Sequence, residues 1–246
     1  MKKFQLFFFP YAGGSIAAYH RWRPYLDRRI DIKLPELSGR GKRIYDPLYE
    51  TLEDAVDDIF KLIKDDLYSL PYAFYGHSMG SLIAFELANK IRNHNLPEPQ
   101  HIFFSGRGAP HVPYEDDEKH YLLPDEAFKN KIIEMGGTPK EFFEHPELLA
   151  VLLPMIRSDF KIAETYEFKG TLKPFNNDIT VFLGKDEKIN ADEVYGWREV
   201  TSKLCTLHFF EGGHFFINDY SEQIVTFINH TLFHPSKESK PYPIGF

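Results

Sequence analysis

The sequence predicts an α/β domain in which helices flank a mostly parallel central sheet, with a helical insertion over one edge of that sheet. Short apolar runs alternate with helical patterns along most of the 246 residues. This alternation is interrupted over residues 112–168, where only short helical patterns occur. We therefore expect one domain over residues 1–234, with an insertion over about 112–168 that acts as a lid, and a loose tail over 235–246.

The composition argues against several classes of protein. A net charge of −7 argues against a general nucleic-acid binder, which normally carries a basic face. A single cysteine excludes an internal disulfide framework and fits a reducing cytoplasm. The apolar run at residues 4–9 is short and is stopped by Pro10, so it predicts a buried strand rather than a signal peptide. No segment approaches the roughly 18 apolar residues of a membrane span.

The first part of the chain contains two short strands. Residues 4–9 are apolar apart from Gln5, and such a run is typical of a strand buried on both faces of a parallel sheet. The glycine-rich turn at 10–15 follows this strand and opens a helix over 16–26. This turn lacks the spaced glycines and the lysine of nucleotide-binding loops. A second strand over 30–34 leads into a flexible, locally basic loop at 35–43.

The rest of the chain continues the alternation. An amphipathic helix is expected over 51–70, where Thr51 and Asp54 form a capping pair. The other expected helices lie over 82–91, 124–135, 139–143, 146–166, around Trp197 and over 221–233, and the other strands over 72–74, 101–105, 179–183 and 206–210.

A sharp turn after the strand at 72–74 carries the pattern G-x-S-x-G. Gly76 and Gly80 flank Ser78, and a helical pattern follows directly. In the order strand, turn, helix, this pattern is typical of a nucleophile elbow, in which a strained serine is exposed at the top of a sheet. Ser78 is therefore the predicted nucleophile, and His77 is expected to shape the turn rather than act as the base.

The polar residues at the ends of later strands complete a catalytic triad. Ser78, Asp186 and His214 follow one another in the chain order of the α/β-hydrolase fold. We expect His214 to accept the serine proton and Asp186 to orient the imidazole. Glu187 and Asp192 compete with Asp186 for the role of the acid, but Asp186 lies in the expected tight turn.

Two backbone N–H groups are expected to form the oxyanion hole. One belongs to Met79 at the start of the elbow helix, and the other to Ala12 in the glycine-rich turn. No metal site is expected, since the chain has no HExxH or CxxC pairing. His230 and His234 have the spacing of one helix face, but Pro235 ends that helix, and a surface location is favoured.

The motifs together resemble one enzyme family, the type II thioesterases of nonribosomal peptide and polyketide synthesis. The resemblance covers nearly the whole chain up to Pro235. One departure is residues 37–40, Leu-Ser-Gly-Arg, where the family usually has Leu-Pro-Gly-Arg. The matching segments are residues 8–15 (FFPYAGGS), 38–43 (SGRGKR), 75–80 (YGHSMG), 153–160 (LPMIRSDF), 183–186 (LGKD) and 212–216 (GGHFF).

The resemblance implies an editing enzyme that removes acyl or aminoacyl groups from the phosphopantetheine arm of acyl or peptidyl carrier proteins. It implies no cofactor of its own, since the substrate carries the phosphopantetheine, and we expect a cytoplasmic monomer that meets its carrier transiently. We expect Arg40, Lys42, Arg43 and Arg107 to contact the carrier or the phosphate of its arm. An ordinary solvated basic loop is the alternative.

Two other functions remain open from the sequence. The same fold and triad would serve a small-ester or lipid carboxylesterase, because the fold does not select the acyl acceptor. A hydrolase-like binding module without turnover is disfavoured by the intact set of Ser78, Asp186 and His214. Hydrolysis of an acyl carrier, an acyl-CoA and a p-nitrophenyl ester, compared in wild type and Ser78→Ala, distinguishes the three.

Overall fold

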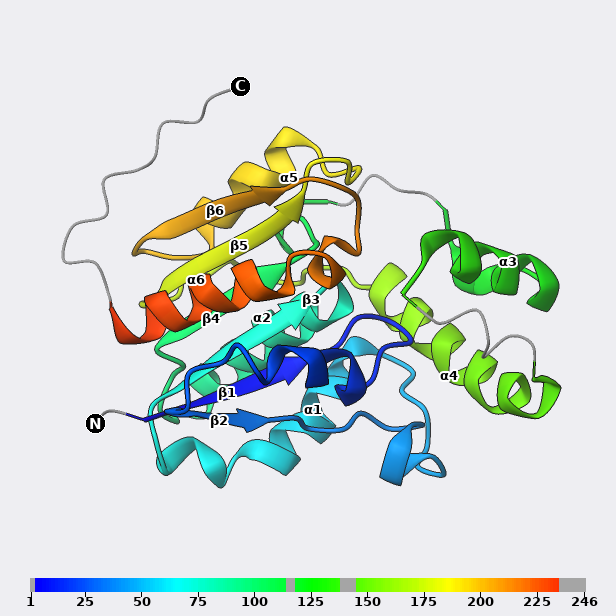
Figure 1. Cartoon of the computed structure of the whole chain (residues 1–246), viewed down its shortest axis with the longest axis horizontal. Coiled ribbons are helices and arrows are strands. Elements are labelled where there is room, and N and C mark those ends of the chain that lie inside the picture. The colour runs from blue at the N-terminus through cyan, green and yellow to red at the C-terminus, as the bar shows by residue number, and fades with distance from the viewer. Residues whose placement is uncertain (1–2, 114–117, 138–144, 235–246) are drawn as a thin grey trace.

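A six-stranded sheet forms the centre of the computed structural model, which describes residues 3–113, 118–137 and 145–234 (Figure 1). The strand order is β2-β1-β3-β4-β5-β6, and all five pairings are parallel. The predicted parallel α/β class is therefore confirmed. The strands are β1 (Phe4–Phe9), β2 (Ile30–Lys33), β3 (Tyr72–His77), β4 (His101–Ser105), β5 (Asp178–Gly184) and β6 (Cys205–Phe210).

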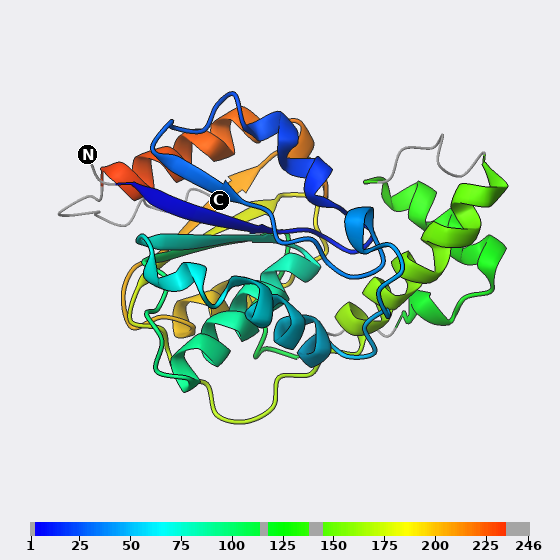
Figure 2. The same cartoon turned by 90° about the horizontal axis from the view of Figure 1, so that it is seen from below.

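Helices cover both faces of this sheet (Figure 2). Helices α1 and α2 pack on one face, whereas the 3-10 helix η1 and helix α6 pack on the other. The described α-helices are α1 (Leu52–Ile63), α2 (Met79–Asn93), α3 (Asp125–Met135), α4 (Pro146–Glu164), α5 (Ala191–Gly196) and α6 (Ser221–Phe233). The 3-10 helices are η1 (Ile16–Trp22), η2 (Gly41–Arg43), η3 (Asp66–Tyr68), η4 (His120–Leu122), η6 (Trp197–Glu199) and η7 (Phe216–Asn218).

Strand β1 shows why this part of the chain is apolar apart from Gln5. Phe4 and Phe8 belong to the core beneath η1 and α6, whereas Phe7 and Phe9 belong to the core beneath α1 and α2. Successive side chains of a strand point to opposite faces, so a central strand covered on both faces needs mostly apolar residues. The buried Gln5 is accommodated because its amide donates to the Asp66 carbonyl at 2.9 Å. The predicted double-sided burial of this strand is confirmed.

The first helical segment differs from the α-helix expected over 16–26. It is a 3-10 helix, η1, in which Tyr19 and Trp22 are the buried residues. A 3-10 helix has three residues per turn, so residues three apart lie on one side, and this spacing places both rings against the sheet. The expected helix over 139–143 and the expected tail over 235–246 lie outside the described residues.

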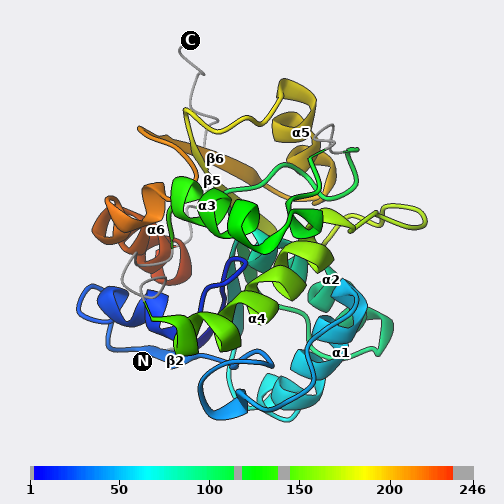
Figure 3. The same cartoon turned by 90° about the vertical axis from the view of Figure 1, so that its right-hand side faces the viewer.

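Between β4 and β5 the chain leaves the sheet and forms η4, α3 and α4. These helices lie beyond the carboxyl ends of the strands (Figures 1 and 3). They have a small core of their own, in which Phe128 and Ile132 from α3 pack with Met155, Ile156 and Phe160 from α4. The part of the insertion that the structure describes is thus helical, and it lies over the edge where the catalytic residues are expected. No helix among the described residues has the length and apolar character needed to cross a bilayer.

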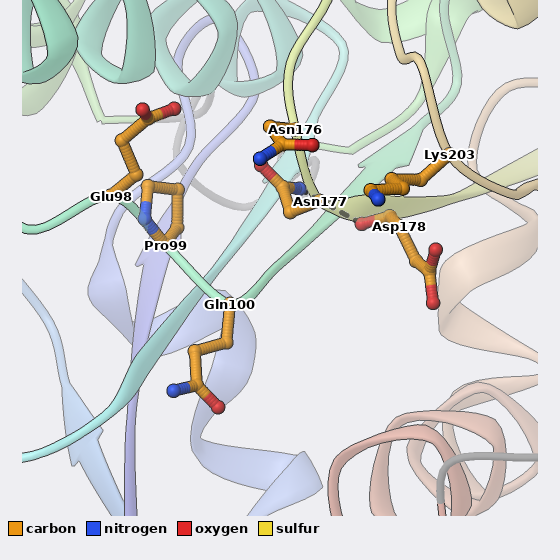
Figure 4. Close-up of a pocket in the computed structure, with 7 residues that line it drawn as sticks. All are labelled: Glu98, Pro99, Gln100, Asn176, Asn177, Asp178 and Lys203. Atoms are coloured by element: carbon orange, nitrogen blue, oxygen red, sulfur yellow. Dashed lines mark hydrogen bonds between the residues drawn. The ribbon is translucent and has the colours of Figure 1, made fainter.

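A polar surface pocket of about 580 Å³ lies at the amino ends of the strands (Figure 4). Its lining residues precede or begin strands β4, β5 and β6, whereas Ser78 follows the carboxyl end of β3. In a parallel sheet these are opposite ends, so this pocket is separate from the predicted catalytic edge. The lining residues are Glu98, Pro99, Gln100, Asn176, Asn177, Asp178 and Lys203.

Candidate active site

Ser78 occupies a strained turn between β3 and α2. Its φ of 57° and ψ of −116° are values that residues with side chains rarely adopt. The flanking glycines make this turn possible. A Cβ on Gly76 would lie 2.0 Å from the carbonyl oxygen of Gly80, and a Cβ on Gly80 would lie 2.0 Å from that of Phe9. The structure thus has the geometry of a nucleophile elbow at the predicted position.

His214 follows β6, and Glu187 orients its ring. Glu187 Oε1 lies 2.7 Å from His214 Nδ1, and the Glu187 side chain is only 4% exposed. A second bond fixes the carboxylate, because the Gly184 N–H donates to Glu187 Oε2 at 2.7 Å. With its Nδ1–H donated to Glu187, the imidazole keeps Nε2 available as a proton acceptor.

The prediction that Asp186 orients His214 is corrected, because the carboxylate that bonds this imidazole belongs to Glu187. Asp186 is exposed, and its backbone N–H donates to the Gly212 carbonyl at 3.1 Å. The turn then closes when the Glu187 N–H returns to the Gly184 carbonyl at 3.3 Å. This turn brings the third residue after Gly184, rather than the second, back toward His214. Asp192, the other competitor, is exposed in α5.

The structure places His214 beside the elbow. The ring of His77, the residue before Ser78, lies 4.9 Å from the ring of His214, centroid to centroid. No hydrogen bond joins the Ser78 hydroxyl to His214 in the described part of the structure. Catalytic hydrogen bonds are often long in unliganded enzymes and shorten when substrate binds. His214 thus lies beside the elbow that carries Ser78, and proton transfer between these two residues is a proposal.

His77 is packed inside the elbow. Its ring is fully buried, and Nδ1 lies 2.8 Å from the Ser105 hydroxyl. Burial, and then the charge of His214, hold the pKa of His77 well below its ordinary value. His77 therefore stays neutral near pH 7. Gly106 leaves room for the ring, since a Cβ there would lie 2.4 Å from His77 Cε1.

The two expected oxyanion donors lie at the same place in the fold. Ala12 belongs to a turn in which the Gly14 N–H donates to the Tyr11 carbonyl at 2.8 Å. Met79 begins α2, and the first N–H groups of a helix have no partner within it. The close approach of Gly80 to the Phe9 carbonyl puts the end of β1 against the start of α2. The arrangement suits a pair of backbone donors from these two segments.

Arg40 does not reach the surface, so its predicted contact with a carrier is corrected. Its side chain is 4% exposed and forms an ion pair with Asp159 of α4, with Nη2 and Oδ1 2.7 Å apart. A second nitrogen, Nη1, donates to the Gly14 carbonyl at 2.6 Å. Asp159 received no role from the sequence. The available signal was its place in the segment 153–160 (LPMIRSDF), one of those that resemble the family.

The other three basic residues differ in their surroundings. Arg43 is engaged by acids, because Nη1 lies 2.6 Å from Asp58 Oδ2. Arg107 is partly buried, and its guanidinium approaches the Ala163 carbonyl at 3.4 Å. Lys42 is exposed, and none of the ion pairs among the described residues involves it. Of the four predicted carrier contacts, Lys42 fits a surface role best.

Comparison with known protein families agrees with the geometry of the site. The family model of the thioesterase domain matches residues 4–232. The chain belongs to this family. It is a hydrolase that acts on thioesters, as the motifs predict, and the match includes every residue of the elbow, the His214–Glu187 pair and the Arg40–Asp159 pair.

Individual relatives agree with the thioesterase assignment in both sequence and structure. The solved structure of ClbQ from the colibactin NRPS/PKS pathway is 33% identical, with a TM-score of 0.87 over 94% of this chain and 97% of that one. The type II thioesterase BorB from the borrelidin cluster is 28% identical, with a TM-score of 0.81 over 94% and 91%. These structures confirm the resemblance to type II thioesterases.

One curated relative has a name from another enzyme class. Linear gramicidin dehydrogenase LgrE of Brevibacillus parabrevis is 38% identical over 92% of this chain and 87% of its own length. The glycine-rich turn of the present thioesterase lacks the G-x-G-x-x-G pattern of dinucleotide-binding dehydrogenases. Its serine elbow instead agrees with the thioesterase family model.

Proposed function

We propose that this thioesterase hydrolyses acyl or aminoacyl thioesters on the phosphopantetheine arm of carrier proteins, and so clears misprimed or stalled synthase modules. The observation that carries the proposal is the elbow at Ser78 beside a His214 that Glu187 orients, within a thioesterase domain. The relatives named for linear gramicidin and colibactin support a role beside peptide or polyketide synthases.

The proposed reaction has two halves. Ser78 Oγ attacks the thioester carbonyl while His214 Nε2 takes its proton, and the N–H groups of Met79 and Ala12 bind the oxyanion. The carbon–sulfur bond breaks, and the carrier thiol leaves with the proton from His214. His214 then takes a proton from water, whose oxygen attacks the acyl-enzyme. The acid is released, and Ser78 regains its proton from His214.

Glu187 stabilises the positive charge on His214 in both halves and keeps the ring in one tautomer. No step in this scheme calls for a cofactor, since the phosphopantetheine belongs to the substrate. The partner is a carrier protein that docks transiently on a monomeric thioesterase. We place the reaction in the cytoplasm, where synthases work and where the single thiol, Cys205, stays reduced.

A comparison of three acyl donors tests the proposal. Hydrolysis of an acetyl carrier protein, acetyl-CoA and p-nitrophenyl acetate is measured with wild type and Ser78→Ala. We expect the highest kcat/KM for the acetyl carrier, and a loss of at least about 10³-fold in Ser78→Ala for every donor. A preference for the ester would instead indicate a carboxylesterase. Turnover that persists in Ser78→Ala would rule out the serine mechanism.

The exposed Lys42 provides a test of carrier docking. Carrier proteins are usually acidic, so we expect Lys42→Glu to lower kcat/KM for the acetyl carrier by about three- to tenfold at low salt. The difference should shrink in 0.5 M salt, because salt screens exposed charges. Hydrolysis of p-nitrophenyl acetate should be unchanged. Lys203→Glu is the matched control, because Lys203 is also exposed but lies at the amino ends of the strands. Equal losses in both variants would contradict a docking role for Lys42.

A further inference from the structure

A buried ion pair joins the inserted helix α4 to the body of the enzyme. Arg40 and Asp159 lie 2.7 Å apart, and their side chains are 4% and 1% exposed. Burying two charges is costly unless each is paired and its remaining hydrogen-bonding groups are satisfied. Arg40 Nε donates to the Ser38 carbonyl at 3.3 Å, and the other bonds that satisfy this pair lead to the turn that contains Ala12.

The ion pair bonds two of the backbone groups that follow Ala12. The Gly13 N–H donates to Asp159 Oδ2 at 2.8 Å. Arg40 Nη1 donates to the Gly14 carbonyl at 2.6 Å. Gly13 has a φ of 75°, so this segment would not stay in place by backbone preference alone. The orientation of the turn is therefore set by two side chains from distant parts of the chain.

The insertion also packs directly on this turn (Figure 3). A Cβ on Gly13 would lie 3.2 Å from Cγ1 of Ile156, one helical turn before Asp159. On the other side, the Tyr11 hydroxyl donates to the carbonyl of Gly137, just after α3, at 3.0 Å. Contacts from α4 and from the segment directly after α3 thus converge on residues 11–14.

We infer that Arg40 and Asp159 are positioning residues, which hold the Tyr11–Gly14 turn so that the Ala12 N–H points at the oxyanion. This inference rests on the oxyanion role proposed for Ala12. An oxyanion donor contributes mainly in the transition state, when the carbonyl oxygen gains charge. A turn released from the ion pair lowers kcat and leaves substrate binding nearly unchanged.

Two conservative variants and a neighbouring control test this inference. Asp159→Asn keeps the size of the side chain and removes its charge, and Arg40→Lys keeps the charge but loses the fork that bonds Asp159 and Gly14 together. Ser158→Ala is the control, because the Ser158 hydroxyl lies on the same helix but donates to the Tyr49 carbonyl, away from the turn. Far-ultraviolet circular dichroism and thermal denaturation establish that each variant is folded.

The readouts are kcat and KM for p-nitrophenyl acetate and acetyl-CoA, together with the Kd of an alkylboronic acid that forms a tetrahedral adduct with the serine. We expect kcat to fall about 10- to 100-fold in both variants, with KM within about twofold of wild type. Boronate affinity should fall in parallel with kcat. Ser158→Ala should match wild type in all three quantities.

Folded variants with unchanged kcat and boronate affinity would overturn the inference, as would a rise in KM alone. Failure of both conservative variants to fold would also overturn it, in favour of a purely structural ion pair. These results are separable from the proposed function. If wild type prefers esters to carriers, the carrier proposal fails, whereas the effect of Asp159→Asn on ester kcat still decides the positioning role.

Discussion

The Glu187 carboxylate uses each of its oxygens for a different bond. Oε1 accepts from His214 Nδ1, and Oε2 accepts from the Gly184 N–H, both at 2.7 Å. The backbone bond prevents the carboxylate from rotating away from the imidazole. A single glutamate thus fixes both the tautomer and the direction of the His214 ring.

Exchanging one oxygen of this carboxylate for nitrogen tests its role. In Glu187→Gln the side chain keeps its size but cannot stabilise a positively charged imidazole. We expect kcat for p-nitrophenyl acetate to fall by about 10³- to 10⁴-fold with little change in thermal stability. Asp186→Asn, one position earlier and exposed, should keep activity within about twofold of wild type. The reverse ranking of the two variants would restore Asp186 as the catalytic acid.

Glu187 and Asp186 show which part of the site cannot be predicted from the sequence. The elbow at Ser78 is predictable because its requirement is local: a strained serine needs neighbours without side chains. The acid depends on how the β5 turn meets the end of β6. Two backbone hydrogen bonds set that register. The Lys185 N–H donates to the Phe210 carbonyl, and the Asp186 N–H donates to the Gly212 carbonyl. The residue types around Asp186 indicate neither of these bonds.

At the scale of the elements, α1 has a complete capping box. The Thr51 hydroxyl accepts from the Asp54 N–H at 3.1 Å, and the Asp54 carboxylate accepts from the Thr51 N–H at 2.9 Å. The hydrogen bond with Thr51 is the main cause of a lowered Asp54 pKa. This cap was predictable from the spacing of the two residues, since both partners lie within one turn.

Removing the cap should weaken the fold and leave the chemistry intact. Thr51→Ala loses the acceptor for one of the unpaired N–H groups at the start of the helix. We expect the free energy of unfolding in urea to fall by about 1 kcal/mol, with kcat unchanged. Lys64→Ala, an exposed substitution at the other end of α1, should change it by less than about 0.5 kcal/mol. A loss of activity in Thr51→Ala would contradict a purely structural role.

The loop before η2 carries the one departure from the family pattern. The Ser38 N–H donates to the Tyr49 hydroxyl at 3.0 Å, and the Ser38 hydroxyl donates to the Pro47 carbonyl. A proline at this position would have neither donor. The serine therefore replaces the stiffness of a proline ring with two hydrogen bonds within the same loop. The neighbouring Arg40 shows the limit of sequence reasoning here, because its partner Asp159 lies in a distant helix.

On the scale of the whole molecule, three partly or fully buried histidines favour the neutral form. Burial lowers the pKa of His101 to about 3, and it also lowers the pKa values of His77 and His208. In the unfolded chain a histidine titrates near its ordinary pKa of about 6.5. Between these values the unfolded state binds more protons than the folded state, so stability is lost as the pH falls from about 6.5 toward 3.

His101 makes this effect measurable. Its Nε2 lies 2.9 Å from the Thr180 hydroxyl, so His101→Phe combined with Thr180→Val removes both polar partners together. Between pH 7 and 4.5 we expect the free energy of unfolding of wild type to fall by about 2–3 kcal/mol more than that of the double variant. Thr180→Val alone retains His101 and should follow wild type. Equal pH dependence in all three proteins would show that His101 is protonated in the fold.

The architecture as a whole was the most predictable feature. Alternating strand and helix patterns predict a parallel sheet, and the interruption at 112–168 predicts the inserted helices, because each signal is repeated over many residues. The contacts of the insertion with the body depend on three-dimensional packing. The link from α4 to the turn at residues 11–14 is the clearest case.

That link has a consequence for protein engineering. Asp159 belongs to the insertion, whereas Arg40 and the Tyr11–Gly14 turn belong to the N-terminal part of the chain. A chimaera that exchanges only residues 112–168 between relatives would separate a buried carboxylate from the cation and the backbone donor that match it. The exchangeable module is therefore discontinuous in sequence, and a functional graft must carry residues 11–14 and 38–40 along with the two helices.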